Sequence, residues 1–384
     1  MPTPQQVIDP ITIDNYGRMA WENILQSYPT ANQFFKKGNI TRDCHGNQLT
    51  WPIEAGRNDV YITQDYEDVT SNYQMTRAYA QPSIDWAQLA VFKAISKGQL
   101  KRNNGKEALV QWSKKAIPAM YRDGLNGPTL SLFDQFFNMN IQSYTTKVAF
   151  AGLPSVFTGN SAITWSSTAK EGTINNTDYA GLSCVLSGIT TVDNVEADAW
   201  TPTAVNTTST AWAGGSSNAT FQYNAFEILT YAISAASRFS PTDESQNPDE
   251  VVMTRTMYNS VAYQMNQKQS FLLTKAVGKG ASFGIGQDVS KGLEHNGVPI
   301  RWDGHLATST GYVLNYSQMW LDFLPKLEFS GDSVGELKRS GDDESIFETE
   351  IRYNDGRRAL TVSATTDGQF RINPRNQVML YAGA

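Results

Sequence analysis

The sequence has few cysteines, few histidines and no long apolar runs, and each shortage excludes a class of protein. Its two cysteines, Cys44 and Cys184, stand far apart and form no CxxC motif, which argues against a disulfide framework and a cysteine-ligated zinc site. No run of eighteen apolar residues occurs, so we expect no helix that spans a membrane. The three histidines, His45, His295 and His305, lack metal-ligand spacing such as HExxH, and we expect His295 and His305 in exposed loops.

Net charge is also small outside one segment. The net charge is −6, and residues 331–350 alone contribute −5, because seven acidic residues there are accompanied only by Lys338 and Arg339. The rest of the chain is therefore close to neutral and lacks the basic face that a protein gripping nucleic acid would carry. We expect the acidic segment to be a solvated loop, since it lacks the D-x-D-x-D-G spacing of a calcium-binding loop.

The motifs of common active sites are missing as well. No GxSxG pentapeptide marks a nucleophilic serine, and the glycine-rich stretch GKGASFGIG lacks the GK[ST] ending of a phosphate-binding loop. Asp303 and His305 suggest a hydrolase, but residues 297–321 around them are interpreted more simply as a strand, a loop and a strand. We therefore predict no catalytic residue, no metal and no cofactor, and we keep a hydrolase that uses Asp303 and His305 as an alternative.

A long two-stranded ribbon is predicted near the start of the chain. Apolar and polar residues alternate in NQLTWPIEAGRNDVYITQDYE, and Gly56 supplies a turn between arms over 41–54 and 57–70. Arms of this length reach about 45 Å, whereas a compact chain of this size has a radius of gyration of about 21 Å. Because an isolated ribbon is only marginally stable in water, a ribbon that projects from its subunit needs a neighbour to lie on.

Helices are expected on both sides of a β-rich insert. Residues 14–28 predict a short helix ended by Pro29. Residue spacing and capping signals then predict helices over 84–98, with Ser83 as the cap, around 109–120, with Pro118 inside, and over the apolar cluster 132–137, with Pro128 in the first turn.

From about Gly152 the composition changes. Residues 150–220 are rich in Ser, Thr, Asn and Gly, which favours short strands and long loops. Beyond this insert we expect a helix capped by Asn224, then a strand and a helix that begins at Thr254 or Thr256, and finally strands that include a hairpin with its turn at Asp355 and Gly356.

The order of these parts resembles the major capsid proteins of tailed bacteriophages, which have the Hong Kong 97-type fold. The segments that carry the resemblance are NQLTWPIEAGRNDVYITQDYE, PDEVVMTRTMYNSVAYQM and NGVPIRWDGHLATSTGYVLNYSQMWL. The resemblance covers the chain from about Thr41 to its end and implies an α+β fold with a long spine helix. It divides the chain into an N-terminal arm (1–40), an extended β-hairpin loop (41–80), a peripheral domain with the spine helix (81–150), an axial domain (151–335) and strands that return to the peripheral domain (336–384).

The resemblance implies a structural subunit and not an enzyme. Such a subunit assembles with copies of itself, as hexamers and pentamers, into an icosahedral shell around the double-stranded DNA genome of a phage. Expected partners are a portal protein, a scaffolding protein and DNA held by weak, non-specific contact, with no membrane. The protein would assemble in the host cytoplasm and end in the virion. Another virion structural protein, such as a tail or surface component, is the first alternative, and the hydrolase is the second.

In this family the extended loop overlaps the adjacent subunit, so the resemblance implies that its side chains form a subunit interface. The residues assigned to it are Trp51, Glu54, Arg57, Asp59, Tyr61 and Tyr66. Some members of the family crosslink a lysine of this loop to an asparagine of a neighbour. Residues 38–88 contain no lysine, so we predict a shell without that covalent bond.

Overall fold

The structure is a computed structural model of the chain. It describes residues 28–37, 39–42, 44–54, 79–102, 106–140, 149–175, 179–182, 200–237, 247–269, 293–325, 327–329, 337–339, 346–354 and 359–382. The chain forms two compact units. Unit 1 consists of residues 1–47, 85–153 and 319–371, and unit 2 of residues 48–84, 154–318 and 372–384. Each unit thus joins segments that are distant in the sequence, whereas the division expected from the sequence used consecutive ranges.

Unit 1 is built on a long antiparallel pair of strands, β6 (Ala87–Ser96) and β17 (Ala359–Ile372), which are paired along the whole length of β6. The strand β16 (Glu348–Asn354) is antiparallel to β17 as the other arm of a hairpin, which confirms the predicted hairpin, although its turn lies outside the described residues. The strand β13 (Met319–Phe323) also pairs with β17, and β1 (Ile40–Thr41) runs parallel to β13.

The strand β6 replaces a helix that the sequence predicted over residues 84–98, and that prediction is wrong. Side chains along β6 alternate between buried and exposed, so that Leu89 and Ile95 are 9% and 8% exposed and Phe92 is 64% exposed. Leu89, Phe92 and Ile95 recur every three residues, which also fits a helix. Pairing with β17 over the full length of β6 decides for the strand period and against the helical one.

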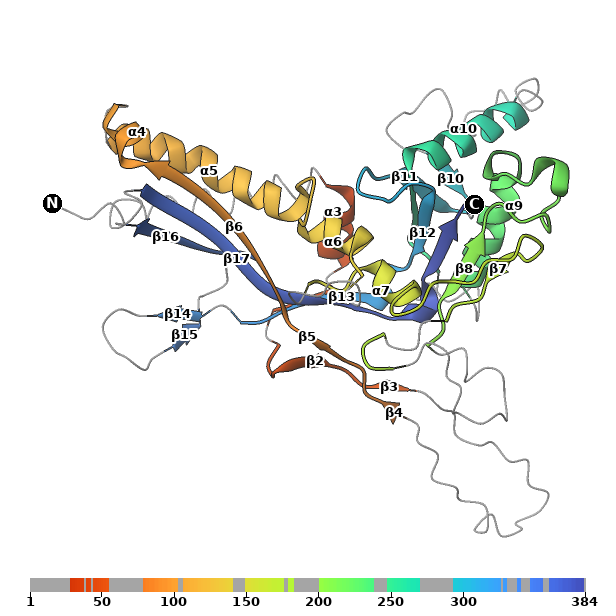
Figure 1. Cartoon of the computed structure of the whole chain (residues 1–384), viewed down its shortest axis with the longest axis horizontal. Coiled ribbons are helices and arrows are strands. Elements are labelled where there is room, and N and C mark those ends of the chain that lie inside the picture. Colours follow the sequence, from red (N-terminus) through yellow and green to blue (C-terminus); the bar gives the residue numbers. More distant parts are fainter. Residues whose placement is uncertain are drawn as a thin grey trace, which may run out of the picture. The chain divides into compact units, whose positions relative to one another are not determined.

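The long helix of unit 1 is α5 (Lys106–Asn126), which runs along β6 (Figure 1). It confirms the helix predicted around 109–120 and continues through Pro118 without a break. Gly124 lets α5 pack closely against Phe347 and Val91, because a Cβ at this position would lie 2.8 Å from the ring of Phe347 and 3.2 Å from Val91. The short helix α4 (Lys97–Arg102) precedes α5.

Aromatic side chains form the core of unit 1 at α6 (Leu132–Asn138) and α3 (Pro29–Lys37). The ring of Phe34 lies 5.4 Å from that of Phe136, which lies 4.9 Å from that of Phe370 on β17. The predicted apolar cluster is therefore core. Two helix boundaries differ from the prediction. Pro29 begins α3, while the helix expected over 14–28 lies outside the described residues, and Ser131 rather than Pro128 starts α6.

Unit 2 contains a seven-stranded sheet in the order β10-β11-β9-β12-β18-β8-β7. Within it β9 is parallel to β11 and β8 is parallel to β18, while the other pairs are antiparallel. The strands are β7 (Glu171–Gly172), β8 (Thr203–Asn206), β9 (Glu250–Met253), β10 (Leu293–His295), β11 (Val298–Trp302), β12 (Thr310–Leu314) and β18 (Val378–Tyr381). The predicted strand, loop and strand within residues 297–321 are confirmed.

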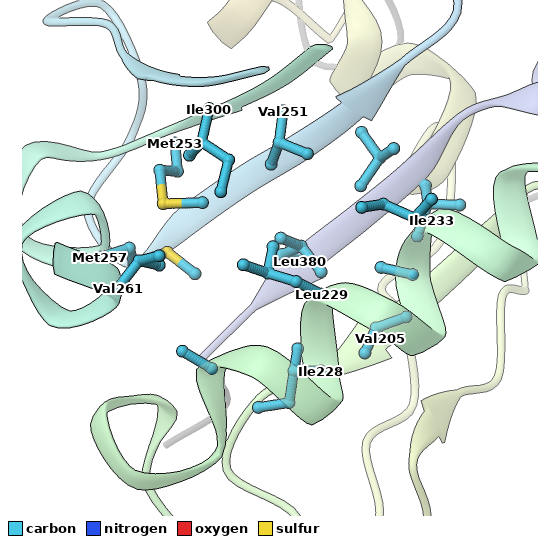
Figure 2. Packing of buried hydrophobic residues seen from close by; sticks show 14 of the residues in the cluster. Val205, Ile228, Leu229, Ile233, Val251, Met253, Met257, Val261, Ile300 and Leu380 are labelled. Atoms are coloured by element: carbon cyan, nitrogen blue, oxygen red, sulfur yellow. The ribbon is translucent and has the colours of Figure 1, made fainter. Parts of the chain in front are cut away.

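Two helices, α9 (Phe221–Ala236) and α10 (Arg255–Gln269), supply the other half of the unit 2 core. Figure 2 shows side chains of the strands, among them Met253, Ile300 and Leu380, pointing into the same space as Leu229 of α9 and Val261 of α10. Burial of this continuous apolar surface is the main term that stabilises the unit.

The starts of these two helices test two predictions. Thr254 directly precedes α10, as the sequence indicated. Asn224 lies inside α9 rather than at its N-cap, which is Thr220. The Asn224 side chain instead accepts a hydrogen bond from the Gly214 N–H (3.0 Å) and donates one to the Asn218 carbonyl (2.8 Å), so it ties the preceding loop to the helix.

Short elements complete the described chain. They are α7 (Leu153–Phe157), a two-stranded sheet of β14 (Leu327–Phe329) and β15 (Leu337–Arg339), and the 3-10 helices η4 (Ser216–Asn218), η5 (Tyr316–Gln318) and η6 (Pro374–Asn376). Parts of the acidic segment 331–350 are therefore strands, in β15 and at the start of β16, and not only loop as predicted. Within the described ranges, no helix is long and apolar enough to cross a membrane.

Candidate functional site

The described ends of the predicted ribbon lie in unit 2 and pair with each other. The strand β2 (Gln48–Thr50) pairs with β5 (Ser83–Asp85), and β3 (Ile53–Glu54) is antiparallel to β4 (Tyr79–Ala80). We call these four strands the ribbon root. The outgoing arm of the ribbon thus has its partner at residues 79–85. The predicted returning arm over 57–70 and the turn at Gly56 lie outside the described residues.

An aromatic stack holds the ribbon root in place. Trp51 is only 6% exposed, and its ring centroid lies 6.4 Å from that of Trp200, which stacks on Tyr179 at 5.6 Å. The Tyr179 hydroxyl donates a hydrogen bond to the Ile372 carbonyl (3.3 Å) and accepts one from the Ile372 N–H (3.2 Å). The Trp51 N–H donates to the Pro82 carbonyl (3.4 Å), which joins the two arms.

This burial changes the role of one residue that was expected at a subunit interface. The Trp51 side chain packs inside its own unit, so little of its area is available to a neighbour. Glu54 ends β3 at the point where the described part of the ribbon stops. Arg57, Asp59, Tyr61 and Tyr66 lie outside the described residues, and their place at an interface stays a prediction.

The second candidate site is the connection between β11 and β12, which carries Asp303 and His305. Arg301 donates from Nε and Nη2 to the two carboxylate oxygens of Glu250, at 2.9 and 2.7 Å. Its Nη1 donates to Asp303 Oδ2 at 3.2 Å. Asp303 Oδ1 accepts from the His305 N–H at 3.0 Å and lies 3.0 Å from His305 Nδ1. The Tyr316 hydroxyl donates to Glu250 Oε1.

The members of this cluster are well buried, and their charges compensate one another. The side chains of Glu250, Asp303 and Arg301 are 4%, 15% and 19% exposed. Burial alone would raise the pKa of Asp303, but the hydrogen bonds from His305 and the charge of Arg301 outweigh it and lower that pKa to about 2. Burial opposes the charge of Arg301, yet its pairing with Glu250 raises the pKa of the guanidinium above its ordinary value.

The arrangement can fix a loop, and its geometry does not favour acid–base chemistry. Both Asp303 oxygens already accept hydrogen bonds, one from Arg301 and the other from the His305 backbone. A carboxylate with a pKa of about 2 is a poor proton acceptor near neutral pH. Glu250, Arg301 and Tyr316 were not singled out from the sequence. Glu250 lies 51 and 66 positions from its two partners, so no local pattern could reveal the cluster.

The histidines occupy different positions from those predicted. His305 is 13% exposed within the cluster, and His295 lies in β10 with its Nε2 2.8 Å from Thr230 Oγ1, so the expectation of exposed loops is wrong for both. His45 is exposed. In the part of the chain that the structure describes, no group of three or more His, Cys, Asp or Glu side chains could hold a metal ion.

Comparisons with known proteins find similarity in structure but not in sequence. Neither models of known protein families nor curated protein sequences match the chain. A chain of the cyanophage A-1(L) capsid asymmetric unit has a TM-score of 0.50 at 12% identity, over 89% of this chain and 90% of that chain. Chains of the satellite phage P4 procapsid with its size determination protein and of the Myoviridae phage XM1 capsid also match. Their TM-scores are 0.46 and 0.44, their identities 8% and 11%, and they cover 94% and 91% of this chain and 89% and 92% of their own.

The chain therefore has the mixed helix-and-sheet fold of the cyanophage A-1(L) capsid chain, and the predicted α+β, Hong Kong 97-type fold is confirmed. The long helix α5 lies within residues 81–150, where the spine helix was expected. The peripheral and axial domains, with the bounds that the sequence suggested, stay predictions.

Proposed function

We propose that this protein is a structural subunit that assembles with copies of itself into the icosahedral capsid shell around the double-stranded DNA genome of a tailed phage. The observation that carries the proposal is the shared fold with the cyanophage A-1(L) capsid chain, which extends over nearly the whole of both chains. The ribbon root supports it, because β3 and β4 form an antiparallel pair with residues 55–78 between them.

The loop between β3 and β4 is the proposed contact with an adjacent subunit. Two short paired strands cannot by themselves stabilise a long ribbon in water, so contact with a neighbouring copy would stabilise the loop. Glu54, Arg57, Asp59, Tyr61 and Tyr66 would supply polar and aromatic groups for that contact, a mixture common at protein interfaces. The buried contact of the Trp51 ring with the Trp200 ring would hold the base of the loop.

The partners follow from the same proposal. Copies would associate as hexamers and pentamers, with a portal protein and a scaffolding protein as further partners, and the protein would pass from the host cytoplasm into the virion. The net charge of −6 suits a shell whose DNA must slide during filling. Each phosphate that a Lys or Arg neutralises strengthens DNA binding steeply, so a weakly acidic chain leaves the contact with DNA weak and non-specific.

Expression of the full chain alone, followed by sedimentation velocity and electron microscopy, tests the proposal. We expect closed polyhedral shells that form above a threshold concentration. Tubes or flat sheets would instead favour another virion structural protein, such as a tail or surface component. A monomer at all concentrations would contradict the proposal.

A further inference from the structure

The turn between α5 and α6 in unit 1 holds an exposed leucine in a backbone conformation that leucine disfavours. Leu130 has a φ of 55° and is 51% exposed. For a leucine this left-handed conformation is less favourable than the helical one by a factor of about five or more. The side chain is about half exposed, so burial in its own subunit covers only about half of its apolar area and leaves the rest in water.

Both backbone groups of Leu130 are fixed by side chains of α6. Its N–H donates to Asp134 Oδ2 at 2.7 Å, and its carbonyl accepts from Gln135 Nε2 at 2.9 Å. Asp134 is itself held by Asn138, which donates to its other oxygen at 2.9 Å. Gln135 accepts from the Phe150 N–H at 3.0 Å in the core of unit 1.

The backbone conformation of the turn is therefore fixed by several hydrogen bonds from neighbouring side chains. Ser131 adds a hydrogen bond to the Gly127 carbonyl at 2.9 Å and accepts one from the Asp134 N–H at 3.3 Å. Disfavoured backbone conformations persist where neighbouring groups enforce them, and they concentrate at functional positions. Here the enforcing contacts hold a half-exposed apolar side chain on a rigid support.

We propose that Leu130 is a contact residue between subunits, whose side chain packs against a second copy of this chain. The inference deepens the proposed function and rests on it. The turn from Gly127 to Phe133 carries no charge, so its contact with a protein surface displaces water without leaving an unpaired charge. The same absence of charge makes DNA phosphates an unsuitable occupant, because they are bound chiefly by cationic side chains.

A second copy can offer a suitable receiving surface. In the described part of unit 1, Leu130 and Phe92 are large apolar residues whose side chains are more than half exposed. Phe92 lies on the outer face of β6 between Ala90 and Ala94, opposite Ser363 of β17. Uncharged, apolar surface of this kind on one copy can cover Leu130 of another in a head-to-tail contact, which repeats around a closed assembly.

The variant Leu130→Asn tests the inference, because asparagine tolerates the left-handed conformation and is polar. Its threshold concentration for assembly is measured by sedimentation. Its Tm is measured below the threshold of the wild-type chain, where both proteins are unassembled. We expect a threshold at least about fivefold higher, from the loss of a half-buried leucine at each contact, together with a Tm equal to or above that of the wild-type chain. A contact that stabilised only the subunit would lower the Tm.

Two control variants separate the side chain from the backbone. Leu130→Met keeps an apolar side chain and is expected to assemble within about twofold of the wild-type threshold. Ser309→Asn relaxes another left-handed residue, with a φ of 63°, without removing apolar surface, and it is expected to leave the threshold unchanged. If Ser309→Asn raised the threshold as much as Leu130→Asn, relief of backbone strain would be the cause and the inference would be wrong.

The remaining outcomes distinguish this inference from the proposed function. If the wild-type chain assembles and Leu130→Asn assembles at the same concentration, Leu130 is no contact residue while the capsid proposal stands. If Leu130→Asn lowers the Tm of the unassembled subunit by several degrees, the role of Leu130 lies in folding and the inference also fails. A wild-type chain that stays monomeric at every concentration would contradict both the inference about Leu130 and the proposed function.

Discussion

Asp303 and His305 show how the partners of a residue decide its role. An aspartate bonded to a histidine is part of many hydrolase sites, yet here the second oxygen of Asp303 binds Arg301, and Arg301 in turn binds Glu250 across two parallel strands. The sequence could place both residues between two strands, because the alternation of apolar residues is local. It could not reveal the ion pairs, because Glu250 comes from a strand far away in the chain.

The lowered pKa of Asp303 makes its contribution to stability dependent on pH. The folded pKa of about 2 lies below the ordinary value of 3.8, so the unfolded chain binds the proton first as the pH falls. The contribution is fully present above pH 3.8, amounts to about 2 kcal/mol, and is lost between 3.8 and 2.

We therefore expect Asp303→Asn to be less stable than the wild-type chain by about 2 kcal/mol near pH 6. The difference should shrink toward zero near pH 2. Urea unfolding of the unassembled proteins across this range measures it. Asp85→Asn, at an exposed carboxylate, serves as the matched control for the loss of one negative charge. A difference for Asp303→Asn that stays constant with pH would contradict the assignment of a lowered pKa to Asp303.

At the scale of elements, the sequence predicts the helices and strands whose apolar residues recur with an unambiguous period. The helices α5, α9 and α10 and the strands β9, β11, β12 and β18 follow from spacing and caps, and all lie close to where they were expected. Residues 84–98 fit both a helix and a strand, and only the pairing of β6 with β17, more than 260 residues later, settles the choice. Long-range pairing of this kind leaves no local signature.

The contact between the α6 region and the segment that follows it depends on Gly152. A Cβ at Gly152 would lie 2.1 Å from the Gln135 carbonyl oxygen and 2.6 Å from that of Phe136. These are backbone atoms, so relief would require α6 to move away from the core. We expect Gly152→Ala to lower the free energy of unfolding by about 3 kcal/mol or more.

Gly98→Ala is the matched control for this prediction. Gly98 lies in α4, where the nearest atom to an added Cβ is 3.9 Å away, so alanine should leave the free energy of unfolding unchanged or raise it by up to about 1 kcal/mol. Urea unfolding of both variants measures the contrast. Equal effects at the two glycines would contradict the close backbone approach at Gly152.

At the scale of the whole molecule, what the sequence could predict was an order of parts rather than a set of contacts. The sequence predicted a ribbon, a long helix, a β-rich insert and a closing hairpin in an order that resembles a capsid subunit, and the fold shared with the cyanophage A-1(L) capsid chain agrees with that resemblance at an identity of only 12%. The division into two units could not be predicted, because each unit joins segments from both halves of the chain. In the proposed shell, contacts between copies must stabilise the assembly, whether these contacts are covalent or not.

The absence of lysine from residues 38–88 bears directly on whether the contacts between copies are covalent. An isopeptide crosslink from the loop between β3 and β4 needs an amine on that loop, and neither the described strands at its base nor residues 55–78 supply a lysine. We expect purified shells, boiled in denaturant, to run on a gel as a single band at the position of the monomer. Shells treated with glutaraldehyde beforehand serve as the positive control for a ladder of oligomers. If untreated shells gave the same ladder, the copies would be covalently joined through another pair of residues, and non-covalent contacts at the loop would not suffice to explain the stability of the shell.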